Sequence, residues 1–332
     1  MGRDRRGIGA LLAAGLLAGV MVSSVPAQGA GPSVCARAAA AEPQAGHNMP
    51  YPAPVLFAKD FPHLADCEWG FPLGGWGGIR RHSKLNHTPV IFVHGNQADA
   101  ENWFLVADQF KKLGGYTDQE MYALSYNGLG NAYAGMPLRS QPAPESQAYW
   151  AANPNALCCS GGKGASDDPN VPDLYNFVRA VQAYTGSTKV DIVAHSLGVT
   201  ITRKMLQLHP GMRRDVVAAV MIAGGNHGTT VCRGISTAYY GCDEIAPDTT
   251  WLANLNRSGE SPGPTRWMSI YNGNDNLDPF FQAVPGVFDD RQSPHLNGAV
   301  NVEFPQTYHN DLRVDPTIVA TYLKFLLQGG QN

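Results

Sequence analysis

One serine of this chain has the neighbours that a nucleophile needs. The apolar, β-branched run Val190–Val193 ends abruptly in AHSLG, and a segment with helical periodicity follows at once. This strand–turn–helix layout is that of a nucleophile elbow, in which a strained turn exposes a serine hydroxyl. Ala194 and Gly198, two residues before and after Ser196, are small enough for such a turn. We therefore predict that Ser196 is a nucleophile at a helix N-terminus, where developing negative charge is stabilised.

The same pattern of small residue, any residue, serine, any residue and glycine occurs again around Ser261, in SGESPGPT. No apolar run precedes this second serine, and Pro262 stands where the helix would have to begin. The surrounding sequence therefore favours Ser196 and leaves Ser261 as the alternative.

A serine nucleophile needs a base to accept its proton and an acid to orient that base. In the elbow architecture the acid follows the serine along the chain, and the histidine follows the acid. The apolar run Trp267–Tyr271 leads into NGNDNLDP, where Asp275 is the preferred acid and Asp278 the alternative. His309 lies between the last apolar run and the last helix, which is the position expected for the base.

The other histidines are less suitable. His195 lies inside the elbow and is expected to point away from the site, whereas His227 comes too early in the chain order. His295 precedes the final apolar run and remains an alternative base.

Two backbone N–H groups are needed to stabilise the oxyanion of an acyl transfer. Leu197, the residue after the nucleophile, is predicted to supply one of them. The other is predicted in the turn HGN after the first core strand, at Asn96, with Gln97 as the alternative. Gly95 in this turn would allow close approach of the backbone.

The elements that must position these groups alternate along the chain. Apolar runs typical of buried strands occur at 88–93, 121–126, 190–193, 216–223, 267–271 and 300–304. Segments with helical periodicity or capping signals occur at 98–113, 171–184 and 316–327, the last opened by an Asp-Pro cap. This alternation predicts an α/β fold with a mostly parallel central sheet and helices on both faces. The segment GFPLGGWGGIR is expected to be a loop, and the stretch 224–264 is expected to be rich in loops.

The first residues are typical of an export signal. Arg3, Arg5 and Arg6 precede the apolar stretch Ile8–Val22, and small residues follow up to Ala27. We therefore expect a secreted protein, exported by the Sec or the twin-arginine route, with no stable membrane span after cleavage.

The predicted domain organisation is simple. Residues 1–27 are the expected signal peptide, and residues 28–332 are expected to form a single catalytic domain with an irregular N-terminal extension to about residue 86. The net charge of −3 and the lack of a basic run argue against nucleic-acid binding.

The six cysteines favour disulfides in an exported protein. Cys232 and Cys242 share one loop and are the preferred pair, whereas the adjacent Cys158 and Cys159 are expected to have different partners. No Cys-x-x-Cys motif with matching histidines occurs, so we expect neither a metal site nor another cofactor.

Several of these segments resemble a known family. TPVIFVHGN, AYTGSTKVDIVAHSLG and the loops of Asp275 and His309 resemble those of secreted bacterial class 2 lipases of the α/β-hydrolase fold. TPVIFVHGN and VDIVAHSLGVT are equally similar to an extracellular poly(3-hydroxybutyrate) depolymerase type with a lipase-like serine box. The resemblance implies a triad of Ser196, Asp275 and His309, with Asn96 and Leu197 as oxyanion donors.

The resemblance implies a secreted serine hydrolase of carboxylic esters that acts through an acyl-enzyme. Its expected substrate is an apolar acyl ester, either a glyceride or, as the alternative, an aliphatic polyester of the poly(3-hydroxybutyrate) type. Peptide or amide hydrolysis would use the same machinery. A catalytically inactive binding module is the remote alternative, disfavoured because no triad member is missing.

Overall fold

The computed structural model describes seven stretches of the chain and the single residue 98. The stretches are residues 55–64, 73–95, 100–125, 170–232, 244–247, 249–273 and 293–329, the last of which closes the described part. The chain divides into two compact units, Met1–Gly31 and Pro32–Asn332, and all described residues belong to the second unit. The predicted signal peptide lies outside the described residues.

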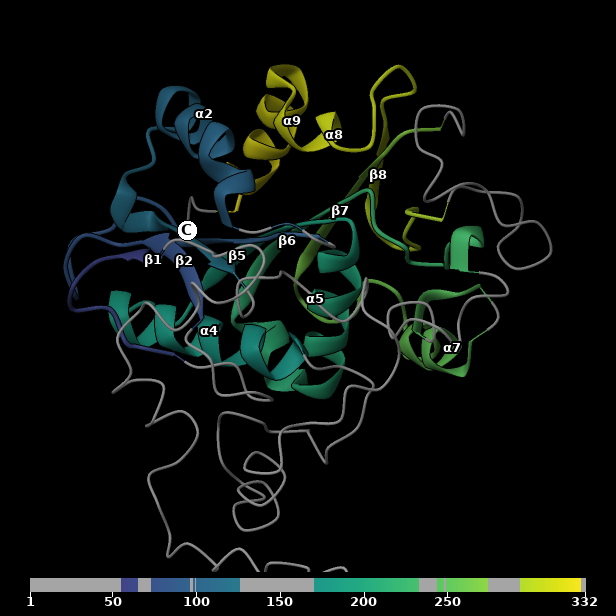
Figure 1. Cartoon of the computed structure of the whole chain (residues 1–332), viewed down its shortest axis with the longest axis horizontal. Helices are drawn as coiled ribbons and strands as arrows, with labels where there is room; N and C mark the ends of the chain where they lie inside the picture. Colours follow the sequence, from purple (N-terminus) through teal and green to yellow (C-terminus); the bar gives the residue numbers. More distant parts are fainter. Residues whose placement is uncertain are drawn as a thin grey trace, which may run out of the picture. The chain divides into compact units, whose positions relative to one another are not determined.

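A sheet of eight strands forms the centre of the described part (Figure 1). The strands are β1 (Val55–Phe57), β2 (Gly74–Gly77), β3 (Val90–Val93), β4 (Met121–Ser125), β5 (Val190–His195), β6 (Val216–Ile222), β7 (Arg266–Tyr271) and β8 (Val300–Glu303). Their order across the sheet is β1-β2-β4-β3-β5-β6-β7-β8. Every neighbouring pair is parallel except β2 and β4, which are antiparallel. The strands β3 to β8 therefore all run in the same direction, and their C-terminal ends lie at one common edge of the sheet.

Helices cover both faces of this sheet (Figure 1). One face carries α2 (Phe104–Gly114), α8 (Asp311–Val314) and α9 (Pro316–Leu327), and the other carries α4 (Asn170–Thr185) and α5 (Leu197–Leu208). The remaining described helices are α7 (Thr250–Arg257) and the 3-10 turns η2 (Ala100–Trp103), η3 (Asp118–Glu120), η6 (Pro210–Arg214) and η7 (Thr230–Cys232). None of the helices in the described stretches is long and apolar enough to cross a bilayer.

The central strands are mostly apolar because both of their faces are covered. Every residue of β3 and of β5 is buried, as expected for parallel strands between two helical layers. One cluster of buried side chains lies on the side of α4 and α5 and includes Phe177, and a second on the side of α2 and α9 includes Phe110. The predicted α/β fold, with a mostly parallel sheet between helices, is confirmed.

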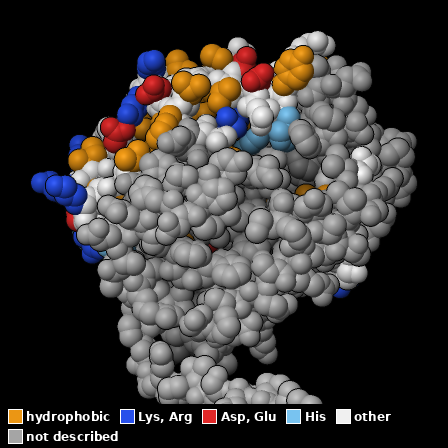
Figure 2. Space-filling view, in the orientation of Figure 1, with side chains coloured by type: hydrophobic (Ala, Val, Ile, Leu, Met, Phe, Trp, Pro, Cys, Tyr) orange, Lys and Arg blue, Asp and Glu red, His pale blue; other side chains and the backbone are white. Residues whose placement is uncertain are grey.

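The outer surface of the α2 and α9 layer is mixed. Figure 2 shows charged and apolar side chains interleaved over this face. The exposed surface of α2 carries both Leu105 and Leu113 and the cations Lys111 and Lys112. Single exposed apolar residues among charges are normal for a folded surface.

The loop prediction for GFPLGGWGGIR is wrong, because this segment contains β2. Gly75 and Gly77 have φ of +133° and +143°, a region that side chains disfavour. A Cβ atom at Gly75 would lie 2.1 Å from the carbonyl oxygen of Ala123, and one at Gly77 would lie 2.5 Å from that of Met121. These glycines serve close strand pairing with β4 rather than a turn.

The stretch 224–264, predicted to be rich in loops, also contains the short helix α7. The Thr249 hydroxyl caps this helix by accepting a hydrogen bond from the Leu252 N–H at 3.3 Å. Leu252 and Leu255 are the buried residues of the helix. Its short apolar face, spanning a single i, i+3 pair, is too brief to stand out as helical periodicity.

Candidate active site

Ser196 occupies a sharp turn between β5 and α5, at the C-terminal edge of the sheet. Its backbone has φ +56° and ψ −128°, and its N–H donates to the carbonyl oxygen of Ile222 at 2.8 Å. A Cβ atom at Gly198 would lie 2.4 Å from the carbonyl oxygen of His94, and one at Gly95 would lie 2.6 Å from the Cβ of Ser196. The turn is therefore possible only with glycine at both positions.

His309 reaches this serine from a loop 113 residues further along the chain. Its Nε2 atom lies 3.1 Å from Ser196 Oγ, a distance at which the hydroxyl can donate to an unprotonated ring nitrogen. The loop lies between β8 and α8, and the His309 side chain is largely buried. The structure thus brings together the predicted nucleophile and the predicted base.

His195 does not point away from the site, and that expectation is wrong. Its Nε2 atom lies 3.1 Å from the main-chain oxygen of His309. Burial lowers the pKa of His195 well below its ordinary value, and the nearby His309, Arg313 and His94 act in the same direction. The side chains of β5 point alternately to the two faces of the sheet. His195, the last residue of the strand, contacts the loop of His309, which crosses the C-terminal ends of the strands.

The predicted acid and one predicted oxyanion donor cannot be placed. Asp275, Asp278, Asn96 and Gln97 all lie outside the described residues. Leu197 is buried at the first position of α5, directly after Ser196. These assignments stay predictions.

The strand that leads to the predicted acid ends beside the loop of the base. β7 lies between β6 and β8 in the sheet, and its last residue is Tyr271. The Phe304 N–H, just after β8, donates to the carbonyl oxygen of Tyr271 at 2.8 Å. The segment that leads to Asp275 therefore begins, at the end of β7, next to the start of the loop that carries His309.

The alternative nucleophile Ser261 and the alternative base His295 make contacts with other loops and strands of the described part. The Ser261 hydroxyl donates to the carbonyl oxygen of Asn297 at 2.6 Å, which ties one loop to another. The His295 ring lies against that of Tyr271, with centroids 6.4 Å apart. The sequence-based preference for Ser196 over Ser261 agrees with this placement.

A buried polar cluster joins α5, the loop after β6, the last turn of α7 and the chain that follows α7. Arg203 Nη1 donates to Asn226 Oδ1 at 3.1 Å and Nη2 donates to Asn256 Oδ1 at 2.7 Å. His227 Nε2 lies 3.1 Å from Glu260 Oε1. Burial lowers the pKa of Arg203 to about 10, although Glu260 opposes this shift. Sequence analysis missed this cluster because its members come from separate segments and share no local pattern.

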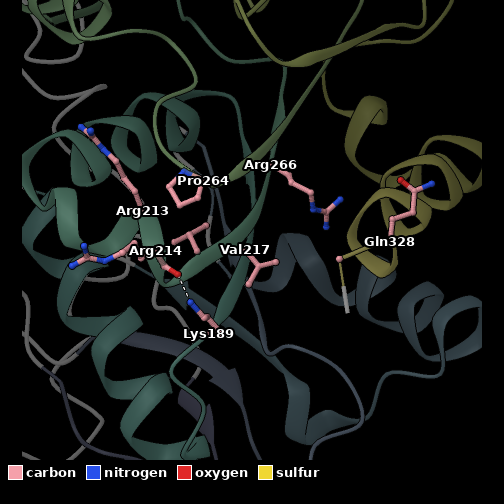
Figure 3. A pocket seen from close by; sticks show the side chains of 9 residues that line it. Lys189, Arg213, Arg214, Val217, Pro264, Arg266 and Gln328 are labelled. Atoms are coloured by element: carbon pink, nitrogen blue, oxygen red, sulfur yellow. Dashed lines mark hydrogen bonds between the residues drawn. The ribbon is translucent and has the colours of Figure 1, made fainter. Parts of the chain in front are cut away.

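A cleft of about 560 Å³ lies elsewhere, where β5, β6 and β7 begin. Because these strands are parallel, this is the edge opposite to Ser196. Two of the cations that line the cleft are bound to carbonyl oxygens, Lys189 to that of Arg214 and Arg266 to that of Phe325 at 2.8 Å. Figure 3 shows the Arg214 side chain directed away from that of Arg266. Lys189 and Arg266 thus bind the C-terminal ends of η6 and α9 rather than one common point of the cleft.

Neither a metal cluster nor a complete disulfide can be assigned from the described part. No group of three or more His, Cys, Asp and Glu side chains in these stretches could hold a metal ion. Cys232 is disulfide-bonded, but its partner, and the predicted partner Cys242, lie outside the described residues. The Cys232–Cys242 pairing stays a prediction.

Solved structures of low sequence identity share this fold. Lipase B of Aspergillus fumigatus matches 76% of this chain with 17% identity and a TM-score of 0.50. The mature lipase BlEst2 of Bacillus licheniformis also matches 76% of this chain, with 13% identity and a TM-score of 0.51. The matched part covers 55% of the Aspergillus chain and 97% of the Bacillus chain. The fold is that of the α/β-hydrolases.

A family model makes the assignment more specific. The model described as lipase (class 2) matches residues 87–134 and 166–284, together half of the chain. The chain therefore belongs to the class 2 lipase family, which consists of carboxylic ester hydrolases. The match includes Ser196 and ends before His309. No curated protein matches this sequence.

Proposed function

We propose that this protein is a secreted lipase or esterase that cleaves apolar acyl esters through a serine triad. The observation that carries the proposal is the 3.1 Å contact between Ser196 Oγ and His309 Nε2, made at a strained turn on the strand edge. Membership of the class 2 lipase family supports ester hydrolysis in particular.

In the proposed reaction the Ser196 oxygen attacks the ester carbonyl carbon while His309 Nε2 takes the hydroxyl proton. The backbone N–H groups of Leu197 and Asn96 would stabilise the oxyanion, supported by the positive end of α5. His309 then protonates the leaving alcohol, and water attacks the acyl-enzyme with His309 as base. Asp275 is proposed to hold the imidazole in the required tautomer.

A matched pair of serine variants tests this proposal. We expect Ser196→Ala to lower kcat for a p-nitrophenyl ester by about 10⁴-fold or more, because triad members act as a unit. Ser261→Ala, at the second copy of the same sequence pattern, should retain the wild-type rate. A fluorophosphonate should label Ser196 of the wild-type protein, as identified by peptide mass spectrometry. Loss of activity in Ser261→Ala alone, with circular dichroism unchanged, would contradict the assignment.

A panel of substrates tests which acyl esters the protein hydrolyses. It comprises p-nitrophenyl esters of rising chain length, a triolein emulsion and amorphous poly(3-hydroxybutyrate). Faster hydrolysis of triolein than of the polyester would support the lipase proposal, and the reverse ranking would favour a polyester depolymerase.

Secretion is proposed from the order of charged, apolar and small residues at the N-terminus. N-terminal sequencing of protein recovered from the culture medium tests it. We expect the mature chain to begin at Gln28, and an intact N-terminus on exclusively cell-bound protein would contradict export.

A further inference from the structure

Two consecutive residues at the end of β5 hold the same residue of a distant loop. Ser196 Oγ lies 3.1 Å from the imidazole Nε2 of His309, and His195 Nε2 lies 3.1 Å from the main-chain oxygen of His309. The centroids of the two imidazole rings are 4.8 Å apart, and the ring planes meet at 47°. The side chain and the main chain of His309 are thus both tied to one strand end.

The His195 ring acts as a neutral donor in this arrangement. A carbonyl oxygen only accepts hydrogen bonds, so Nε2 of His195 must carry the hydrogen. The side chain is buried, and burial together with His309, Arg313 and His94 holds the pKa of His195 well below its ordinary value. Neutrality suits the site, because a second cation would disfavour the imidazolium that His309 becomes when it accepts a proton.

The loop of His309 depends on such contacts because it has no regular structure between β8 and α8. The Phe304 N–H donates to the Tyr271 oxygen at 2.8 Å at one end, and the Asp311 N–H donates to the Tyr308 oxygen at 2.9 Å at the other. The bond from His195 is made at His309 itself. A displacement of about 1 Å in a catalytic group can lower the rate about 10²-fold, so a contact at this residue matters for turnover.

We propose that His195 is a positioning residue whose Nε2–H group fixes the main chain of His309, so that the imidazole faces Ser196. The proposal rests on the proposed function, in which His309 is the base. It assigns His195 no contact with substrate and no part in proton transfer.

Two substitutions of equal length test the role of the donor. The amide N–H of His195→Gln can reach the place of the ring Nε2–H, whereas His195→Met fills similar space without a donor. We expect His195→Gln to keep kcat within about threefold of wild type and His195→Met to lower it about 10- to 100-fold. KM for a soluble p-nitrophenyl ester should change by less than about twofold in both, because the residue acts on the base rather than on substrate.

Equal turnover of the two variants, whether both are active or both impaired, would overturn the proposal. If His195→Met does not fold, the test rests on His195→Gln alone. A loss of kcat above about tenfold in that variant would overturn the proposal. His209→Phe is the control for loss of a histidine outside the site, where His209 stacks on Tyr175 at 3.8 Å, and it should leave kcat unchanged.

The wild-type protein separates this inference from the function on which it rests. Absence of ester hydrolysis and of fluorophosphonate labelling at Ser196 in the wild type would overturn both proposals. An active wild type, an inactive Ser196→Ala and equal His195 variants would overturn only the positioning role.

Discussion

The backbone of Ser196 stores strain that its neighbours make tolerable. A non-glycine residue at φ +56° and ψ −128° is unfavourable by about 1–3 kcal/mol. The hydrogen bond from its N–H to Ile222, at 2.8 Å, holds the turn, and the missing side chains of Gly95 and Gly198 leave room for it. This backbone conformation directs the Ser196 hydroxyl away from the sheet and towards the His309 ring.

At the same scale, we predict that Asp275 rather than Asp278 orients His309. Asp275→Asn should lower kcat about 10³- to 10⁴-fold, because an amide at this position favours the wrong imidazole tautomer. Asp278→Asn should have a much smaller effect, since this residue is further from the end of β7. Steady-state kinetics on a p-nitrophenyl ester compares the two variants, and the reverse ranking would move the acid to Asp278.

At the scale of elements, the polar cluster around Glu260 connects parts that the sheet does not join. His227 Nε2 lies 3.1 Å from its Oε1, and the Asn297 N–H donates to its Oε2 at 2.6 Å. Burial disfavours the carboxylate, but the hydrogen bonds from His227 and Asn297 and the charge of Arg203 outweigh it. Together they lower the pKa of Glu260 to about 2. A carboxylate held in this way stabilises the folded chain only while it is ionised.

We therefore expect a stability contribution from Glu260 that depends on pH. It should be fully present above the ordinary pKa of 4.5 and should be lost as the pH falls towards about 2. Glu260→Gln should lower the free energy of unfolding by about 3 kcal/mol at pH 7 and by about 1 kcal/mol near pH 3, because part of the stabilisation is already lost there. Urea denaturation at the two pH values measures this.

The exposed Asp108→Asn in α2 is the control for loss of one carboxylate, and it should change the free energy of unfolding little at either pH. An equal effect of Glu260→Gln at pH 3 and pH 7 would contradict the role of the ionised carboxylate.

At the scale of the whole molecule, the buried sheet contains a carboxyl group that burial penalises. Asp191 lies in β5 at a register irregularity between β5 and β6, where its Oδ1 accepts from the Ala218 N–H at 3.0 Å. Burial raises the pKa of Asp191 to about 7, although the Ala218 hydrogen bond and the charge of Arg266 oppose this. The Asp191 carboxyl group accepts a hydrogen bond that the irregular pairing of β5 and β6 leaves open. When this group is ionised, its burial lowers the free energy of unfolding.

The stability of the whole domain should therefore fall as the pH rises from about 4 to about 7, because the unfolded chain releases this proton first. Asp191→Asn keeps an acceptor for Ala218 without the charge. It should be more stable than wild type at pH 8, by up to about 4 kcal/mol, and nearly equal to it at pH 4.

Urea denaturation at pH 4, 6 and 8 measures the difference. Asp215→Asn, at a partly exposed residue 3.4 Å from Arg179, should bring no gain at pH 8. A destabilised Asp191→Asn at pH 8 would show that the carboxylate is needed in its ionised form.

The sequence by itself determined the main elements and the candidate nucleophile and base. The strands from β3 to β8 and the helices α2, α4 and α9 follow from local patterns, because strands covered by helices on both faces consist mostly of apolar residues. The elbow of Ser196 is also local, since strand, turn and small residues are contiguous. His309 could be chosen because chain order restricts which loop can reach the serine.

Only the tertiary structure decided what depends on contacts between distant segments. Gly75 lies in a strand because the Ala123 carbonyl of β4 leaves no room for a side chain there. His195 faces the base because a loop that begins more than a hundred residues later crosses the end of β5. The pairing of His227 with Glu260 likewise joins two loops. None of these neighbours is close in sequence, so no local pattern of residues could reveal them.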